Sequence, residues 1–395
     1  MLSTLRLSPM NSPGVRPSSL RELGRYFLKL GSIGFGGPIA LAGYMERDLV
    51  QDRRWFTETD YKQGLALAQL HPGPLAAQLA IFLGYIHSGI LGATVIAIAF
   101  VLPSFLMVLV ISALYVQYGG LRSMQALFYG IGAAVIGIIV RSAYKLTKRQ
   151  VGKKRLLWVI YAVMALVTAI TRTEIVWLFI LSGLIAMAVY APPSRIPKAV
   201  RTVAIIPWLG FLSPQGKAPV DPETLWKIIA YFTKAGAFVF GSGLAVVPFL
   251  YGGVVRDFHW LTEKQFIDAV AVAMITPGPV VITVAFIGYL VAGIAGASLA
   301  AIGIFVPVYL FVVIPTPWYR KFGTSPKIVA FVDGVTAAAV GAITGAVYVI
   351  GRGAIKDAPT ALIALGSLLA LIYTKLPEPL IVAIAGMLGL FLYKG

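Results

Sequence analysis

The sequence predicts an all-α polytopic membrane protein in which two homologous, inverted helical repeats follow one another. Two observations predict this fold class: an apolar composition with long hydrophobic runs, and a self-similarity that extends along almost the whole chain. Hydrophobic residues make up 58% of the 395 positions and charged residues only 12%, whereas roughly a quarter of the residues in a soluble domain are charged. The mean hydropathy of +0.86 excludes an ordinary soluble fold.

Several apolar runs are long enough, or nearly long enough, to cross a bilayer, which takes about 20 residues of helix. They cover residues 89–116, 124–143, 156–170, 175–190, 285–313, 358–373 and 380–393. The shorter runs are marginal as single spans. Together with segments that glycine or proline interrupts, these runs predict about 10–12 transmembrane segments, some of them broken or re-entrant.

The second half of the chain repeats the first. Phe35-Gly36 matches Phe240-Gly241 at a spacing of 205 residues, and after a single-residue gap Pro103 matches Pro307 at a spacing of 204. Such a sustained register predicts two copies of one structural unit. We therefore expect a cytoplasmic N-terminal tail (1–23), a first repeat (24–191), a proline-rich linker (192–225) and a second repeat (226–395).

The distribution of basic residues predicts that the two repeats insert in opposite orientations, because Lys and Arg collect on the cytoplasmic side. The loop 145–155 is rich in them and its counterpart 352–357 is poor, whereas between 119–122 and 320–327 the imbalance is reversed. An inverted pair with about six hydrophobic segments per copy requires either a re-entrant segment or a linker that crosses the membrane.

The charged and metal-binding residues exclude several classes of function. The net charge of +18 fits nucleic acid, anionic lipid or an anionic substrate; basic cytoplasmic loops explain most of it, and we expect no nucleic-acid partner. The absence of cysteine excludes disulfides, Cys-type zinc sites and iron–sulfur clusters. The three histidines are too scattered for a metal site, so we expect no metal and no other cofactor. The first twenty residues lack the apolar core of a cleavable signal peptide.

Each repeat opens with a helix that glycine interrupts. The interrupting residues are Gly36, Gly37 and Pro38 in the first repeat and Gly241, Ser242 and Gly243 in the second. A helix broken inside a membrane is tolerated only where its freed backbone groups face protein or water. If a half-helix starts after the break, its N-terminal N–H groups form an anion site. The alternative is close helix packing through small residues.

A second break follows in each repeat. It consists of His71, Pro72, Gly73 and Pro74 in the first copy and of Pro277, Gly278 and Pro279, preceded by Thr276, in the second. Discontinuous helices paired about a pseudo-symmetry axis form the midplane site of many secondary transporters. We therefore expect the four breaks to converge. His71 either exchanges a proton with the substrate path or makes a structural hydrogen bond.

Charged residues inside apolar stretches are expensive, so those that persist are candidates for function. Lys29 and Lys234 occupy matched positions before the first break, and they either contact an anion or extend to the headgroups. Asp268 and Asp333 lack acidic counterparts, so either of them is a candidate coupling carboxylate on one side only.

The charged loop at 52–58 and its counterpart at 257–263 have a structural explanation. Trp55 and Trp260 are typical of a membrane interface. Thr57 with Asp60, and Thr262 with Gln265, have the spacing of helix N-caps.

The ordered motifs of the first repeat resemble the chromate ion transporter family, of the long two-domain type. They are Phe35-Gly36-Gly37-Pro38, Arg53-Arg54-Trp55, Pro72-Gly73-Pro74 with Gln78, Gly84-Tyr85, Gly92-Ala93 and Leu102-Pro103-Ser104. The resemblance implies oppositely oriented halves and export of chromate from the cytoplasm across the inner membrane. It also implies that the membrane potential or a proton gradient drives export, and that the chain confers chromate resistance. The second repeat departs from the motif at Gly241-Ser242-Gly243, and residues 39–42 lack the histidine that many members carry after Gly-Gly-Pro.

The predicted function is secondary transport of a small oxyanion, with the lipid bilayer as a partner and a second copy of the chain as a candidate partner. Sulfate has nearly the size and charge of chromate, so it remains the close alternative. An intramembrane enzyme is disfavoured because no Gly-x-Ser-x-Gly elbow or recurring Ser/His pair is present. A primary pump is disfavoured by the absence of a phosphate-binding loop. A passive channel remains an alternative function.

Overall fold

The computed structural model describes residues 16–35, 37–152, 154–171, 175–192, 222–238, 246–317, 325–374 and 376–393, and these contain helices and no strand. Gly36, Gly241, Ser242, Gly243, most of the predicted linker and most of the predicted tail lie outside the described residues.

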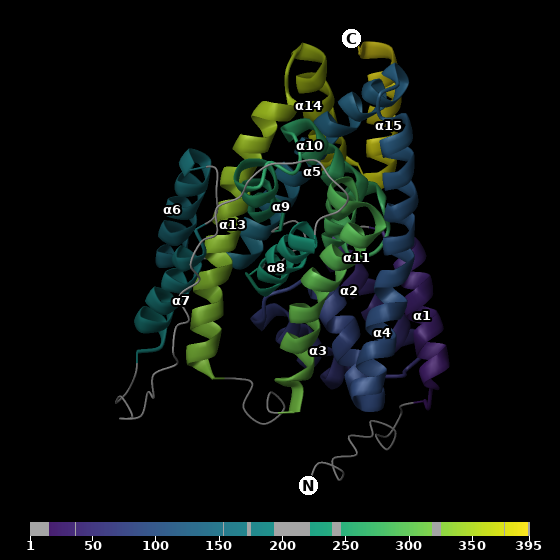
Figure 1. Cartoon of the computed structure of the whole chain (residues 1–395). Coiled ribbons are helices and arrows are strands. Elements are labelled where there is room, and N and C mark those ends of the chain that lie inside the picture. The colour runs from purple at the N-terminus through teal and green to yellow at the C-terminus, as the bar shows by residue number, and fades with distance from the viewer. Residues whose placement is uncertain are drawn as a thin grey trace.

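The two repeats contain the same helices in the same order (Figure 1). The first has α1 (Leu20–Ile33), α2 (Gly37–Met45), the π-helix η2 (Glu46–Asp52), α3 (Glu58–Leu70), α4 (Leu75–Tyr118), α5 (Arg122–Gln150), α6 (Arg155–Thr171) and α7 (Val176–Tyr190). The second has α8 (Pro222–Phe238), α9 (Val246–Tyr251), the π-helix η4 (Gly252–Asp257), α10 (Glu263–Ile275), the 3₁₀ turn η5 (Val280–Ile282), α11 (Thr283–Val313), α13 (Pro326–Ala354), α14 (Ala358–Tyr373) and α15 (Glu378–Leu392).

The backbone angles confirm that the repeats share one fold. Helix α4 is interrupted at Ser88 (φ −145°, ψ 31°) and Gly89 (φ 62°, ψ −145°). Helix α11 is interrupted with nearly the same angles at Ala292 (φ −144°, ψ 30°) and Gly293 (φ 58°, ψ −147°). The N-caps predicted at Thr57 and Thr262 are also confirmed, because each side chain accepts a hydrogen bond from the backbone three residues on.

The first four helices of each repeat are built as hairpins. Gly84 lies against Gly92 across the interruption at Gly89, a contact that requires residues 75–87 to fold back on residues 90–118. The leg 75–87 also packs antiparallel to α3, with Gly64 against Phe82. In the same way α1 pairs with α2 and η2, since Tyr26 reaches Asp48. Among the described residues, the second breaks, at 71–74 and 276–279, lie at the tips of such hairpins.

By length and composition, four of the described helices qualify as membrane spans: 75–118, 122–148, 280–313 and 326–354. Four shorter apolar helices accompany them: 155–171, 177–190, 358–373 and 378–392. The remaining hydrophobic segments of each repeat belong to the hairpins. The span at 326–354 is absent from the apolar runs found in the sequence, because Asp333, Thr336 and Thr344 interrupt its hydrophobicity.

Equivalent helices of the two repeats run in opposite directions. Thr94, early in the long part of α4, bonds through Oγ1 to the hydroxyl of Tyr309, late in α11, at 2.8 Å. Phe105, later in α4, lines the same groove as Ser298, which lies early in the long part of α11. These two helices therefore lie side by side and antiparallel (Figure 1), as the inverted repeats predicted from loop charges require.

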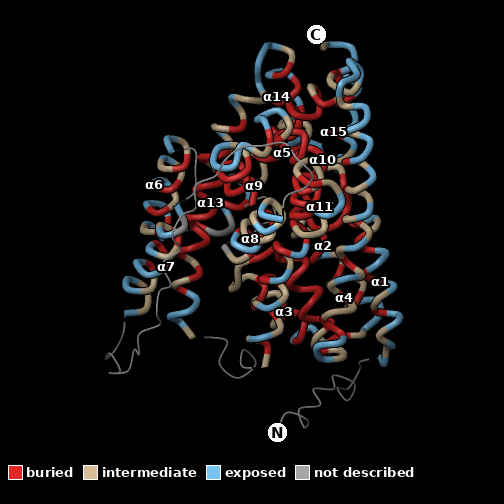
Figure 2. The backbone as a smooth tube through the Cα atoms, in the orientation of Figure 1, coloured by how far each residue is buried: buried red, intermediate tan, exposed pale blue. Residues whose placement is uncertain are grey.

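The repeats also exchange their C-terminal helices. Helix α5 of the first repeat packs against α14 and α15 of the second, and α13 of the second packs against α6 and α7 of the first. Glycines permit the close approach at equivalent places: a Cβ on Gly130 would meet the carbonyl oxygen of Ala385, and one on Gly334 that of Ser182. Buried residues concentrate where these helices cross, while the outer helices show exposed faces (Figure 2).

Replacing Gly130 by alanine is expected to destabilise the protein by about 1–3 kcal/mol, the usual cost of overpacking. The added Cβ has no room, because the carbonyl carbon of Ala385 lies 2.8 Å from its ideal position. Gly366→Ala in α14 is the control, since nothing lies within 4 Å of its Cβ position. Thermal unfolding in detergent measures both variants. Equal melting temperatures for Gly130→Ala and the parent would contradict the exchanged packing.

Candidate functional site

Hairpin tips from opposite repeats meet at the middle of the long part of α4. The backbone N–H of Gly278, in the second break of repeat two, donates to the carbonyl oxygen of Gly34, at the end of α1 in repeat one, at 2.9 Å. Ser104 lies halfway along residues 90–118, and its buried hydroxyl donates to the carbonyl oxygen of Gly31 at 3.2 Å. Two of the four predicted breaks therefore join directly.

The residues of the second break explain its shape. Helix α3 ends where His71 takes an extended conformation (φ −110°, ψ 151°). Pro72 and Pro74 supply no N–H and cannot continue the helix. Gly73 has a φ of 136° and Gly278 a φ of 94°, values that L side chains rarely adopt. A Cβ on Gly278 would also collide with the Ser104 hydroxyl, so glycine is required there on two counts.

Gln78 holds the first-repeat tip in place. Its side-chain Nε2 donates to the carbonyl oxygen of Pro72 at 2.6 Å, and the residue is completely buried. Its Oε1 is buried without a hydrogen-bond partner among the described residues. A buried acceptor without a donor costs about 1–3 kcal/mol. In repeat two the equivalent Thr283 donates to the carbonyl oxygen of Val280 at 2.8 Å.

The tip of repeat one is more accessible than that of repeat two. His71 and Pro72 are half-buried, as are Gly37 and Pro38 of the first hairpin, whereas residues 276–279 are buried. The His71 Nδ1 lies 3.0 Å from the carbonyl oxygen of Leu67, so the structural hydrogen bond considered from the sequence is present.

The other charged candidates are distributed over the molecule. Lys29 and Lys234 lie at exposed positions of α1 and α8, and neither forms a hydrogen bond or ion pair with a described residue of the breaks, so their substrate role stays a prediction. Asp333 forms an ion pair of 2.7 Å with Lys154. Asp268 is buried and accepts a hydrogen bond from the hydroxyl of Tyr115 at 2.7 Å.

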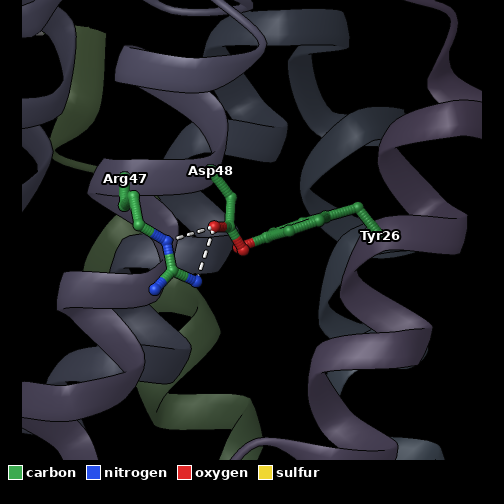
Figure 3. Close-up of polar contacts among 3 residues, drawn as sticks. All are labelled: Tyr26, Arg47 and Asp48. Atoms are coloured by element: carbon green, nitrogen blue, oxygen red, sulfur yellow. Dashed lines mark hydrogen bonds and ion pairs between the residues drawn. The ribbon is translucent and has the colours of Figure 1, made fainter.

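A charged cluster lies along the first hairpin, away from its tip (Figure 3). The Asp48 carboxylate accepts hydrogen bonds from the Tyr26 hydroxyl at 3.2 Å and from Arg47 Nε at 2.9 Å. The guanidinium of Arg53 stacks on the rings of Tyr26 and Trp55, with distances of 5.5 and 4.7 Å to the ring centroids. Arg53 forms no ion pair with a described residue.

Repeat two replaces this cluster by aromatic packing. Gly253 takes the place of Asp48, and Phe258, in the place of Arg53, stacks on Trp260 at 4.4 Å. Tyr231, equivalent to Tyr26, donates to the carbonyl oxygen of Phe249 instead. The charged cluster was not predicted from the sequence. The signal that reveals it is the replacement of charged residues by glycine and phenylalanine at matched positions.

Comparison with known families decides which class of transporter this arrangement represents. The family model described as chromate transporter matches residues 21–187 and again residues 226–390. The chain belongs to the chromate transporter family. The resemblance noted in the sequence is thereby confirmed, and it covers both repeats.

Individual relatives extend along nearly the whole chain. The chromate transport protein of Cupriavidus metallidurans is 59% identical over 376 residues, which are 95% of this chain and 94% of the relative. The probable chromate transport protein of Synechococcus elongatus is 56% identical and covers 95% of this chain and 96% of its own length. The chromate transport protein of Pseudomonas aeruginosa is 30% identical, with coverages of 94% and 92%. No solved structure matches the chain. The protein is thus a multi-pass membrane member of this family.

Substituting Gly278 by alanine is expected to disturb the junction of the hairpin tips strongly. The new methyl group would strain a φ of 94° and push the tip off Ser104, so the Gly278–Gly34 hydrogen bond would be lost. Gly152→Ala is the control, because Gly152 has a φ of 57° with open space around its Cβ position.

Both variants are measured for transport of labelled anion and for thermal stability, and Gly278→Ala is expected to lower transport by at least about tenfold while Gly152→Ala costs at most about 1–2 kcal/mol. Equal transport in the two variants would show that the tip contact is dispensable.

Proposed function

We propose that the chain is a secondary transporter that exports chromate from the cytoplasm across the inner membrane. Export is driven by the membrane potential or a proton gradient and gives resistance to chromate. Membership of the chromate transporter family and the relatives named as chromate transport proteins support a transporter over an enzyme. The observation that carries the mechanism is the meeting of inverted hairpin tips halfway along α4.

The first-repeat tip has the chemistry of an oxyanion site. The first helical hydrogen bond of α4 runs from the Gln78 N–H to the Pro74 carbonyl oxygen at 3.1 Å. The N–H groups of residues 75–77 therefore precede the helical ladder and have no partner within it. N–H groups at a helix N-terminus attract anions through their orientation and the helix dipole.

Gln78 supports this assignment independently of the helix end. It is completely buried, and its unpaired Oε1 lies on the first turn of α4. A hydrated or singly protonated oxyanion supplies the donor that this oxygen lacks. The same amide keeps its hydrogen bond to Pro72, so it positions the tip and presents an acceptor at once. In this proposal Gly36, Gly37, Pro38, His71, Pro72, Gly73 and Pro74 line the anion path from repeat one.

The second repeat contributes differently to the proposed site. Its tip residues Pro277, Gly278 and Pro279 are buried, and they close the site from the opposite side. Arg47 and Arg53 lie on the exposed surface of repeat one, where positive charge raises the local concentration of anions. Repeat one therefore supplies the proposed entry path. Lys29 and Lys234 add positive charge at exposed positions.

Uptake into everted membrane vesicles tests the proposed function. We expect vesicles from cells that make the protein to accumulate labelled chromate, and to do so more when a membrane potential or a proton gradient is imposed. Accumulation of sulfate alone would replace the substrate and keep the transporter. Accumulation of neither anion by correctly folded protein would overturn the proposal, and uptake indifferent to both gradients would indicate a passive channel.

Replacing Gln78 by glutamate is expected to raise the KM for chromate by at least about tenfold. The isosteric carboxylate repels a dianion a few ångströms away by more than about 1 kcal/mol, and it loses the donor to Pro72. Gln63→Glu in α3 is the matched control, because Gln63 Oε1 is also buried without a described partner, while the residue lies two turns before the tip. Initial rates against chromate concentration separate the two variants. An unchanged KM for Gln78→Glu would remove this residue from the anion path.

A further inference from the structure

Asp268 is the most buried carboxyl group among the described residues. Only 3% of its surface is exposed, against 8% for Asp60. Its one hydrogen-bond donor is Tyr115, at 2.7 Å, and it forms no ion pair with a described residue. An ionised carboxylate in such surroundings is expensive, because one hydroxyl replaces only part of its hydration. The gain of a proton removes that cost.

A pocket borders this carboxyl group. Asp268 lines a cavity of about 260 Å³ that α5, α10 and the end of α13 enclose. Lys264, Lys356 and Asp357 are exposed side chains that line the same cavity. A proton from the aqueous phase therefore has a path to Asp268 that does not pass the hairpin tips.

Several ionisable groups of the described residues lie around Asp268. Tyr115 of α4 donates to it, and Lys264 of α10 and Lys356, which precedes α14, are the cations that face it. The cavity also contains Tyr129 of α5, which donates to Asp357 at 2.6 Å, and Tyr393, which donates to Gln125 at 3.1 Å. Glu263, on the first turn of α10, accepts from Tyr251 at 2.5 Å. None of these carboxylates competes for the Tyr115 hydroxyl in the described structure.

The Asp268–Tyr115 hydrogen bond ties a hairpin of repeat two to a long helix of repeat one. From Asp268 the chain follows α10 to its end at Ile275 and continues to the tip at Gly278, and α4 runs back from Tyr115 to Ser104. The same two helices therefore touch at both ends of this stretch, through Asp268 with Tyr115 and through Gly278 with Ser104. The rings of Phe128 and Phe286 pack edge-on against Tyr115, with centroids 5.3 and 5.1 Å away, and hold it in position.

Only the second repeat has a carboxyl group at this position. The residue of repeat one that matches Asp268 is Gln63, whose amide does not titrate. The carboxyl group thus distinguishes the two halves of an otherwise symmetric backbone.

We propose that Asp268 binds the proton that is coupled to anion transport. The inference rests on the proposed transport function. The ionised carboxylate accepts a strong, charge-assisted hydrogen bond from Tyr115 and holds the α10 hairpin against α4. A proton that enters through the cavity adds to a carboxylate oxygen, while Tyr115 keeps its own proton. The remaining neutral hydrogen bond is weaker, so the hairpin and its tip are released from Gly34.

Purified full-length protein in proteoliposomes tests the assignment with two assays: exchange of labelled chromate at equal concentrations, and net accumulation driven by a pH gradient. Asp268→Asn is expected to keep exchange at a reduced rate and to lose gradient-driven accumulation by at least about tenfold. Asp333→Asn is the control that keeps both activities, because Asp333 pairs with Lys154 outside the cavity. Asp268→Asn accumulating chromate with the pH profile of the parent would overturn the inference.

Tyr115→Phe gives a second readout if Asp268→Asn is inactive in both assays. Loss of the donor raises the pKa of the carboxyl group, so the midpoint of the pH profile is expected to move up by roughly 0.5–1 pH unit. An unchanged midpoint would overturn the inference. A parent protein without chromate exchange would refute the proposed function instead, and a parent that exchanges chromate but ignores the pH gradient would refute only the proton assignment.

Discussion

Backbone polar groups inside a membrane must be paired within the protein, because hydrocarbon offers no hydrogen bonds. The rest of this fold depends on that constraint. Helix α1 stops at Ile33, and the carbonyl oxygen that follows at Gly34 is paired by the Gly278 N–H of the other repeat. One repeat therefore completes the backbone of the other. The same dependence recurs at the periphery, where α5 and α13 are each covered by the C-terminal helices of the opposite repeat.

The two repeats share a backbone and differ in their polar side chains. Where repeat one has Asp48 bound by Arg47 and Tyr26, repeat two has glycine and stacked aromatic rings. The second break has a half-buried His71 in one copy and a buried Thr276 in the other. The backbone is symmetric and the chemistry is not: repeat one has exposed charges and a more accessible tip, and repeat two has a buried tip and the buried carboxyl group of Asp268.

The sequence predicted the duplication from its internal register and the inversion from the basic residues of equivalent loops. It predicted the places of the breaks because prolines and glycines have local effects that survive any tertiary context. It did not predict that the chain folds back on itself as helical hairpins. The reversal of α4 at Gly89 depends on the Gly84–Gly92 contact, which a single glycine in an apolar run does not reveal. The matched lysines show a second limit of prediction from the sequence. Lys29 and Lys234 occupy equivalent positions, yet both are exposed. A match between the repeats shows that two residues have equivalent environments, but it does not show whether those environments are buried or exposed.

Inverted duplication determines how side-chain differences between the repeats affect the relative energies of two conformations. If the repeats were identical, exchanging their conformations would produce a state of equal energy that opens to the opposite side of the membrane. In the described structure His71 and Pro72 of the repeat-one tip are half-buried, whereas residues 276–279 of the repeat-two tip are buried, so the two tips differ in accessibility. Residues that differ between the copies set which state is favoured. Asp268 and Gln63 are such a pair, and only Asp268 carries a charge that pH changes. In the proposed mechanism, a proton at Asp268 therefore shifts the balance between the two states without any change in the symmetric backbone.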